Sequence, residues 1–389
     1  PNGGATIPLP PNDPGSGQID IFAENFKFPQ LLRASAAVDK KLPWGLVGTA
    51  EVIWSKTLNN IFYENVNLAP STVNLTNGGD TRPKYERNFA GGSIDNTFTA
   101  VYLGSNTSDG YGINATAQLT KTFNKGFAGS IAYTYGDSYA VYEGTSSQNS
   151  SQWRGAYTVN GRNTAPNGRS DFSMGSRLVA YGSYTIDYLN HMSTTVGLFL
   201  NAQSGTPFSY IYNDNGNLTR EDSRERALLY VPRDQNDIVL VDYTDGGNTI
   251  TAAQQWAALD QYISNDKYLS TRRGQYAEKN SNRTPFNTVL DLKLTQDFYI
   301  KAGDKKHDLQ ITFDIFNFTN LLNKNWGRRY FSDFGAVQLI DFEGFQADNT
   351  TPEFTYNVDR TELKDYMFIN DSGVNGSRWY MQIGFRYSF

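Results

Sequence analysis

Few residues of this chain could carry out metal or nucleophilic chemistry. The sequence of 389 residues contains no cysteine and only two histidines, His191 and His307. Because thiolates and histidine clusters are the usual ligands of zinc and iron–sulfur sites, the composition argues against such sites and excludes a thiol nucleophile. The sequence also lacks the G-x-S-x-G, G-x-x-x-x-G-K-[ST] and H-E-x-x-H motifs. We therefore predict a protein that is not an enzyme and that holds no cofactor.

A calcium site is the remaining possibility for metal binding. Asp214, Glu221 and Asp222 lie in a Gly/Asn-rich segment whose carboxylates could bind calcium loosely. The EF-hand pattern itself fails, because Ile211 would occupy its first ligand position and has no side-chain oxygen. An ordinary solvated turn is the favoured interpretation of this segment.

The composition favours β-structure with one polar and one apolar face. The chain contains 25 Tyr, 24 Phe and 6 Trp, although only 39% of its residues are hydrophobic. Disordered chains are depleted in aromatic residues, so the polarity does not predict disorder. The net charge of −5 argues against nucleic-acid binding. With no run of about 18 apolar residues and no fixed repeat, a secreted β-sandwich and a transmembrane β-barrel remain.

Apolar and polar residues alternate in most of nine segments, as expected of strands with one apolar face. The clearest is Trp379–Phe389, in which every second residue from Trp379 onward is apolar or aromatic. Two segments have a mixed phase, and a change of phase at Phe316 and Phe318 suggests a bulge. The nine segments are Gln30–Leu42, Leu46–Lys56, Ile113–Thr120, Phe127–Tyr135, Asp171–Asp187, Val196–Asn201, Leu290–Thr295, Leu309–Ile315 and Trp379–Phe389.

Short and long connections alternate strictly between these segments. A β-sandwich has no reason to place its long loops at one end, whereas outer-membrane barrels have short periplasmic turns and long extracellular loops. The pattern therefore predicts an all-β, transmembrane antiparallel barrel with long extracellular loops. The short connections are Pro43–Gly45, Asn124–Gly126, Tyr188–His191 and Ala302–Lys306, and the long ones are Asn60–Asn96, Ser138–Ser170, Tyr212–Thr284 and Leu321–Ser377.

An odd number of strands predicts that this chain is part of a larger barrel, because bacterial single-chain barrels have even numbers. We expect residues 1–29 to be the remnant of an extracellular loop and residues 30–389 to be the C-terminal part of the barrel. Phe389 would then lie at the periplasmic side. The chain begins with Pro1 and not with Met, so we expect its natural start elsewhere.

The barrel interpretation assigns roles to charged and aromatic side chains. Carboxylates on the polar face could form an acid pair, but a lysine shares that face, so salt bridges or contacts to a plug are favoured. We predict lumen-facing charges at Asp291, Lys293, Asp314 and Arg386. Aromatic rings near strand ends are predicted at the membrane interface, namely Trp54, Tyr133, Tyr135, Trp326, Trp379 and Tyr387. The loop residues Tyr85, Trp153 and Tyr157 could stack on a ligand or pack within the loops.

One long connection contains a predicted helix. Ala252, Trp256, Leu259 and Ile263 recur at helical spacing within Thr249–Ile263, after a cap at Asn248 or Thr249. This helix could cover a pore mouth, but packing of its apolar stripe on neighbouring loops is favoured.

The segment "DLQITFDIFNFTNLLNKNWG" (Asp308–Gly327) resembles the barrel of TonB-dependent outer-membrane transporters, especially the Oar-like, Bacteroidetes-type branch. Supporting similarities are "SNRTPFNTVLDLKLTQDF" (Ser281–Phe298), "NAQSGTPFSY" (Asn201–Tyr210), which looks like the upper end of a barrel strand, and the strand–turn–strand unit Val38–Leu68. The terminal "WYMQIGFRYSF" is similar to the aromatic end that such barrels present to the insertion machinery, with Phe385, Tyr387 and Phe389 as the signal.

This resemblance implies a barrel of about 22 strands with a plug in its lumen and an N-terminal TonB-contacting segment. No plug is visible in this sequence. The leading hypothesis is import of a bulky nutrient by plug displacement, with outer-membrane lipid, the remaining strands, the plug and TonB as partners. The alternative is a barrel scaffold or secretion partner in a surface complex, with surface lipoproteins as partners. Both hypotheses place the chain in the cell outer membrane.

Overall fold

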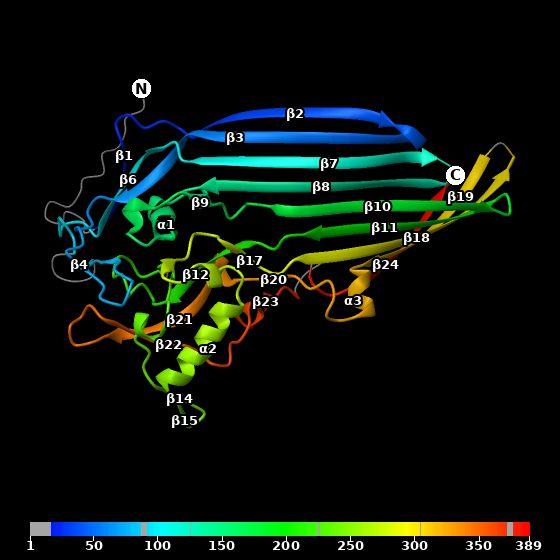
Figure 1. Ribbon diagram of the computed structural model, residues 1–389. Coiled ribbons are helices and arrows are strands. Elements are labelled where there is room, and N and C mark those ends of the chain that lie inside the picture. Colours follow the sequence, from blue (N-terminus) through cyan, green and yellow to red (C-terminus); the bar gives the residue numbers. More distant parts are fainter. Residues whose placement is uncertain (1–16, 87–91, 125, 225, 304, 372–375) are drawn as a thin grey trace.

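The computed structural model describes residues 17–86, 92–124, 126–224, 226–303, 305–371 and 376–389. It consists of a long curved sheet and a folded region made by the long connections (Figure 1). No helix of the described residues is long and apolar enough to cross a membrane.

The main sheet has twelve strands. Each of the nine segments predicted to form strands lies wholly or largely in this sheet, and their strands pair in antiparallel fashion in chain order. These are β2 (Gln30–Leu42), β3 (Leu46–Asn65), β7 (Gly110–Asn124), β8 (Phe127–Ala140), β10 (Gly175–Tyr188), β11 (Met192–Gln203), β18 (Asn287–Ala302), β19 (Lys305–Phe316) and β24 (Tyr380–Ser388). Three further strands of this sheet were not among the nine predicted segments, namely β1 (Gln18–Phe22), β6 (Ala100–Thr107) and β9 (Gly168–Arg169).

Strand β6 continues strand β7 alongside β3. Lys56 pairs with Tyr111 and Asn60 pairs with Thr107, so the register of the two ladders is the same across the break. Strand β1 pairs with the far side of β6 in parallel orientation. The loop predicted at Asn60–Asn96 therefore begins later than expected, because β3 extends to Asn65.

The register of the main sheet places the predicted apolar residues of neighbouring strands on one shared face, and this face is exposed. On β24 the apolar residues Met381, Ile383 and Phe385 are 45%, 52% and 74% exposed. The register places Ile383 beside Phe313 and Phe313 beside Leu294, so apolar side chains form rows across neighbouring strands. A face that exposes rows of large apolar side chains is unstable in water and is the face that lipid covers.

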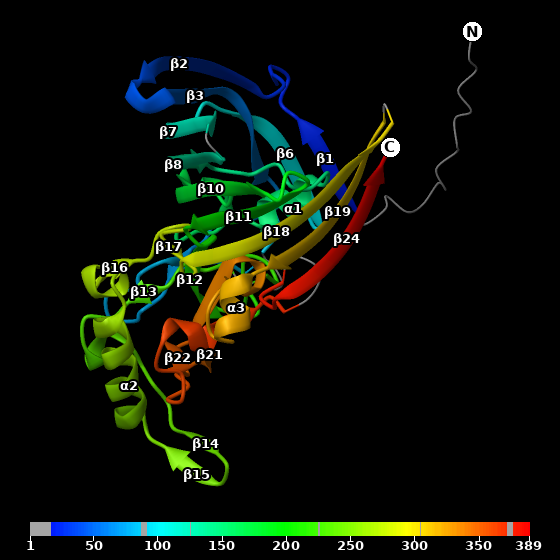
Figure 2. The same cartoon turned by 90° about the vertical axis from the view of Figure 1, so that its right-hand side faces the viewer.

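All short turns lie at one end of the sheet and the long connections at the other (Figure 1). The turn at Pro43–Gly45 is a tight one, with Trp44 at φ 60° and Gly45 at φ 72°. The sheet is curved when seen along its strands (Figure 2). Within the described residues it does not close, because β2 pairs only with β3 and β24 pairs only with β19.

The prediction of a bulge at Phe316 and Phe318 is wrong. Strand β19 ends at Phe316, and Asn317 adopts a left-handed conformation with φ 53° and ψ 50°. This residue turns the chain into helix α3 (Phe318–Leu322), and the change of apolar phase is the change from strand to helix.

The long connections form a second, four-stranded sheet with its own core. Strand β12 (Pro207–Asn213) lies between β17 (Asn282–Arg283) and β21 (Ala336–Phe345), and β21 also pairs with β22 (Pro352–Thr355). Six of the seven residues of β12 are buried, so its sequence shows no alternation. The prediction that Asn201–Tyr210 looks like the upper end of a barrel strand holds only for its first three residues, because β11 ends at Gln203 and β12 begins at Pro207.

Helix α2 (Ala252–Asn265) packs on this second core, which we call the loop core. Its residues Leu259, Tyr262 and Ile263 are buried there, so the favoured packing interpretation is confirmed. The cap is Thr251, two residues after Thr249 and three after Asn248, the predicted alternatives, and it forms a capping box with Gln254. The other buried members of the loop core come from at least four segments, and include Leu75, Phe208, Tyr210, Tyr212, Leu229, Val231, Val337, Ile340, Phe354 and Tyr356.

Short elements complete the loop region. They are β4 (Val73–Asn74), β5 (Pro83–Lys84), α1 (Asn149–Arg154), β13 (Tyr230–Val231), β14 (Tyr243–Asp245), β15 (Asn248–Ile250), β16 (Gln275–Tyr276), β20 (Tyr330–Phe331) and β23 (Phe368–Ile369).

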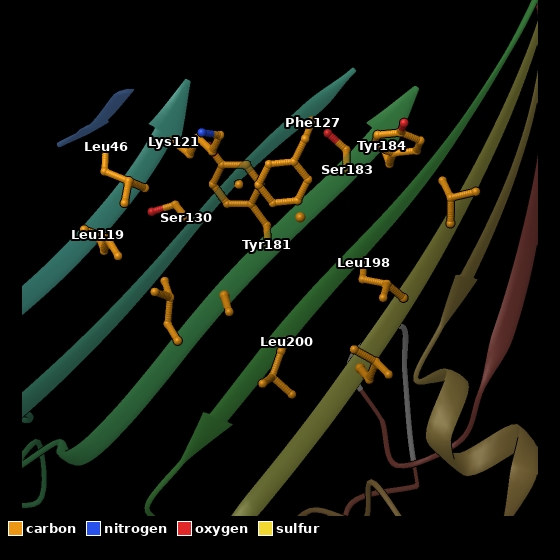
Figure 3. Close-up of a pocket in the computed structure, with 16 residues that line it drawn as sticks. Leu46, Leu119, Lys121, Phe127, Ser130, Tyr181, Ser183, Tyr184, Leu198 and Leu200 are labelled. Carbon is orange, nitrogen blue, oxygen red and sulfur yellow. The ribbon is translucent and has the colours of Figure 1, made fainter. Parts of the chain in front are cut away.

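The apolar face of the main sheet contains a hollow of about 610 Å³. Gly129 and Gly182 lie opposite each other in the ladder of β8 and β10, and they leave space between larger side chains such as Phe127 and Leu198. Figure 3 shows Phe127, Leu198 and Leu200 around this hollow. Its lining is almost entirely apolar, so it fits hydrocarbon better than a polar ligand.

Candidate functional site

The predicted lumen-facing charges share the polar face of the main sheet. Lys293 and Asp314 lie opposite each other on β18 and β19, and their side chains form a salt bridge of 2.7 Å between Nζ and Oδ1. Asp291 accepts a hydrogen bond of 2.7 Å from the backbone N–H of Asn317, at the left-handed turn after β19. Arg386 lies opposite Gln310 and has no ion pair among the described residues. Only two of the four predicted charges therefore pair with each other.

The polar-face carboxylates do not form an acid pair. Asp297 accepts a hydrogen bond of 2.8 Å from Gln310 and a longer one from Ser193. Asp291 and Asp314 have the separate partners already described. Each carboxylate thus holds neighbouring strands or turns together and is not placed for shared proton chemistry.

The three acidic residues considered for calcium are buried and bonded to protein donors. Asp214 accepts hydrogen bonds from the N–H groups of Gly216 and Leu218. Glu221 accepts one from the N–H of Arg162, and Asp222 pairs with Arg154 at 3.0 Å. No cluster of three His, Cys, Asp or Glu side chains in the described residues is arranged to hold a metal ion. The solvated-turn interpretation is wrong as well, because all three side chains are buried.

Burial raises the pKa of Asp214 from 3.8 to about 6, although its two backbone hydrogen bonds act in the opposite direction. The folded state therefore holds a proton that the unfolded chain releases between about pH 4 and pH 6, so the stability of the loop region should fall as the pH rises through this range. The shift sets an upper limit of about 3 kcal/mol on the change. We expect Asp214→Asn to remove most of this slope, measured as the urea midpoint of loop unfolding at several pH values.

Asp95→Asn is the control for this experiment. Asp95 is an exposed loop carboxylate whose pKa is lowered by hydrogen bonds from Thr97, so it titrates below the tested range. The control should keep the slope of the unchanged protein. An equal slope in the Asp214→Asn variant would contradict the assignment.

A cluster around a fully buried ion pair links two of the long connections. The side chains of Asp80 and Arg82 have no exposed surface, and Arg82 Nε lies 2.9 Å from Asp80 Oδ1. The Arg82 guanidinium lies over the rings of Tyr212 and Tyr276 at 5.2 and 5.1 Å, and Nη2 donates to the carbonyl of Leu228 at 2.7 Å. The hydroxyls of both tyrosines donate to Asp80. This buried cluster fixes the connection after β3 to the connection after β11.

The predicted interfacial aromatic residues are all exposed, and all but one lie on a main-sheet strand or directly beside its end. The exception, Trp326, lies in the connection after α3. The exposed fractions lie between 40% and 59% for Trp54, Tyr133, Tyr135, Trp326, Trp379 and Tyr387. The loop aromatic residues behave differently. Trp153 and Tyr157 are buried, and the hydroxyl of Tyr85 donates to the carbonyl of Asn160, so packing within the loops explains them.

The predicted C-terminal signal residues Phe385, Tyr387 and Phe389 are all exposed. Phe385 and Phe389 are 74% and 80% exposed. Tyr387 lies against His307, with its hydroxyl 2.7 Å from Nδ1. The contact joins β24 to the start of β19 near the short-turn end. Within the described residues, His307 forms no hydrogen bond or ion pair with a carboxylate or a serine.

A polar cavity of about 570 Å³ lies in the loop region, and sequence analysis did not find it. Arg224, Arg226 and Arg360 line it together with Asp333 and Asp365. Arg226 lies over the ring of Tyr157 and Arg360 over the ring of Tyr366, at 4.9 and 4.7 Å. The remaining lining residues are Ile211, Phe334, Ala336, Val337, Gln338, Met367 and Phe368.

Phe334 is presented to this cavity by a strained turn. The residue has φ 44° and ψ 30°, a conformation that bulky side chains rarely adopt, and it is 83% exposed. The hydroxyl of Tyr157 donates to the carbonyls of Phe334 and Gly335 at 3.0 and 3.3 Å, which holds the turn in place. An exposed ring beside several guanidinium groups can stack on a sugar or aromatic ring while the arginines bind acidic or hydroxyl groups.

A long antiparallel sheet with an exposed apolar face, short turns at one end and folded connections at the other defines a protein that spans a membrane with strands. A family model described as "Outer membrane beta barrel domain" matches residues 2–338 of the chain. The chain belongs to this family, and its place is the outer membrane. No curated protein matches the sequence.

Proposed function

We propose that the chain is part of a TonB-dependent outer-membrane transporter that imports a bulky nutrient by displacement of a plug. The observation that carries this proposal is the cavity lined by Arg224, Arg226, Arg360 and Phe334, built from folded connections at one end of a membrane-spanning sheet. A region with its own buried core can hold a ligand in a fixed place above a pore. The similarity of several segments to TonB-dependent barrels supports the same function.

The open edges of the sheet support the proposed partners. Among the described residues, β2 pairs only with β3 and β24 only with β19. Because every backbone N–H and C=O group in hydrocarbon needs a partner, we expect further strands at these two edges. The remaining strands and the plug would come from the same protein, and TonB would contact a segment outside this chain. We place the long connections outside the cell and the short turns in the periplasm, and we expect no catalytic activity.

Nutrient import is tested by comparing cells with and without the intact protein in a medium of mixed glycans, peptides and siderophores. Mass spectrometry of the medium should show depletion of one class only when the protein and TonB are both present. Collapse of the proton gradient should stop this depletion. Equal depletion by cells that lack the protein would contradict import.

A scaffold or secretion role in a surface complex is the second candidate. The exposed aromatic residues Phe334 and Phe368 on the folded loop region favour this role, because such residues are common in protein interfaces. Affinity purification from membranes distinguishes the two. Stoichiometric surface lipoproteins together with unchanged nutrient depletion would support the scaffold.

Phe334→Asn provides a sharp test of the cavity. Asparagine adopts positive φ more readily than phenylalanine, so the turn should keep its shape and the fold should be retained or slightly stabilised. Loss of the stacking ring should lower the rate of nutrient depletion about tenfold at limiting concentration, as expected for a ring that anchors a ligand. Phe172→Asn, at a 69% exposed ring outside the cavity, is the control and should deplete the medium normally.

A further inference from the structure

Helix α3 and the residues around it form a basic corner at the long-connection end of β18, β19 and β24. Asn317 fixes this corner, because its side-chain amide donates to the carbonyls of Gly327 and Ser377. The side chain of Asn320 donates to the carbonyls of Lys324 and Trp326. These bonds give the segment after α3 a defined shape beside the start of β24.

Two neighbouring hollows of about 630 and 450 Å³ lie at this corner and share Arg328. Lys324 and Arg378 line the first hollow, and Lys364 lines the second. Asp371 is the one carboxylate among the described residues that line them, and it lies 3.5 Å from Arg378 in an exposed pair. The two hollows are thus lined by four basic residues and one acidic residue, so the corner has a net positive charge.

Apolar side chains of the lipid-facing side line the same two hollows. Phe286 lies four residues before Leu290, in the phase of the apolar face of β18, and Trp379 precedes Met381 in the phase of β24. Trp326 and Leu321 complete the apolar lining, and both are exposed. Aromatic rings next to cations at the end of a membrane-spanning face are placed at the level of lipid headgroups.

We propose that this basic corner binds the phosphate groups of lipid A in the outer leaflet. The arrangement fits an anionic lipid, because the cations can bind phosphate while Trp326, Trp379 and Phe286 contact the upper part of the acyl chains. The assignment rests on the proposed orientation, with the long connections outside the cell, but not on nutrient import.

The test measures lipid binding to the intact protein in detergent by native mass spectrometry. The protein is titrated with diphosphoryl lipid A, with dephosphorylated lipid A and with phosphatidylglycerol, and inorganic phosphate is added as a competitor. Lys324→Gln combined with Arg378→Gln removes two exposed cations and keeps Arg328, whose Nε donates to the carbonyl of Lys324. The matched control is Lys40→Gln with Lys305→Gln, two exposed lysines at the short-turn end.

We expect the corner variant to bind diphosphoryl lipid A about tenfold more weakly, and the control to bind normally. Dephosphorylated lipid A should bind weakly to every form, and inorganic phosphate should compete only in large excess. Equal binding by the corner variant and the unchanged protein would overturn the site. If phosphatidylglycerol binds as tightly as diphosphoryl lipid A or more tightly, lipid A is not the occupant. Nutrient depletion by cells that carry the corner variant tests import separately.

Discussion

Replacing Arg82 with leucine should destabilise the loop region by about 3–5 kcal/mol, because the substitution leaves the Asp80 carboxylate buried without its cation. Both side chains of the pair are fully buried. The bond from Arg82 to the carbonyl of Leu228 and the contacts to Tyr212 and Tyr276 are lost at the same time. Limited proteolysis of the detergent-solubilised protein should show rapid cleavage in the long connections while the strands of the main sheet stay protected.

The double substitution Asp80→Asn with Arg82→Met separates the buried charge from the packing. The asparagine oxygen can still accept from one tyrosine hydroxyl, and the asparagine NH2 group can donate to the hydroxyl oxygen of the other. Methionine fills much of the space of arginine. Replacement of both charged partners often costs little, so the double variant should resist protease nearly as well as the unchanged protein. Equal sensitivity of the single and the double variant would show that the ion pair is not the cause.

Ile383→Arg should destabilise the membrane-inserted sheet by about 2–4 kcal/mol, because a charge would replace an apolar side chain near the middle of a lipid-facing strand. Ile383 is 52% exposed and lies beside Phe313 in a row of apolar residues. The effect is measured as a lower denaturant midpoint for the intact protein in lipid vesicles.

Gln382→Arg is a matched control on the next residue of the same strand. Its side chain is on the opposite face, where it lies across from Asp314. An arginine there meets a carboxylate and the polar face, so the midpoint should change by less than about 0.5 kcal/mol. A large loss in the control, or none in Ile383→Arg, would mean that the faces are assigned the wrong way round.

The strands of the main sheet could be predicted from the sequence because lipid imposes a simple pattern on them. Each side chain faces either hydrocarbon or a polar surface, so Met381, Ile383 and Phe385 alternate with polar neighbours. Strand β12 shows no such pattern, because the folded connections bury both of its faces. The capping box of α2 was visible as Thr251 and Gln254, yet the helical spacing alone suggested an earlier start.

The candidate site could not be predicted, because it is assembled from distant segments. Arg224 belongs to the connection after β11, whereas Phe334 and Arg360 belong to the connection after β19, and none of them lies in a recognisable motif. One local signal was present, since Asp333-Phe334-Gly335 has the glycine of a tight turn. Arg82 looked like an ordinary loop arginine, because its partners Leu228 and Tyr276 follow 146 and 194 residues later in the chain.

The bond between Arg82 and Leu228 also has a consequence for the order of assembly. It closes a stretch of 146 residues, and that stretch includes strands β7, β8, β10 and β11. Contacts of such high sequence separation form slowly, because the intervening chain must first be brought into place. We therefore expect the loop core to fold last, after the neighbouring hairpins have entered the bilayer. A newly synthesised copy would then cross the periplasm with the aromatic residues of the loop core exposed, and it would depend on chaperones that hold it unfolded.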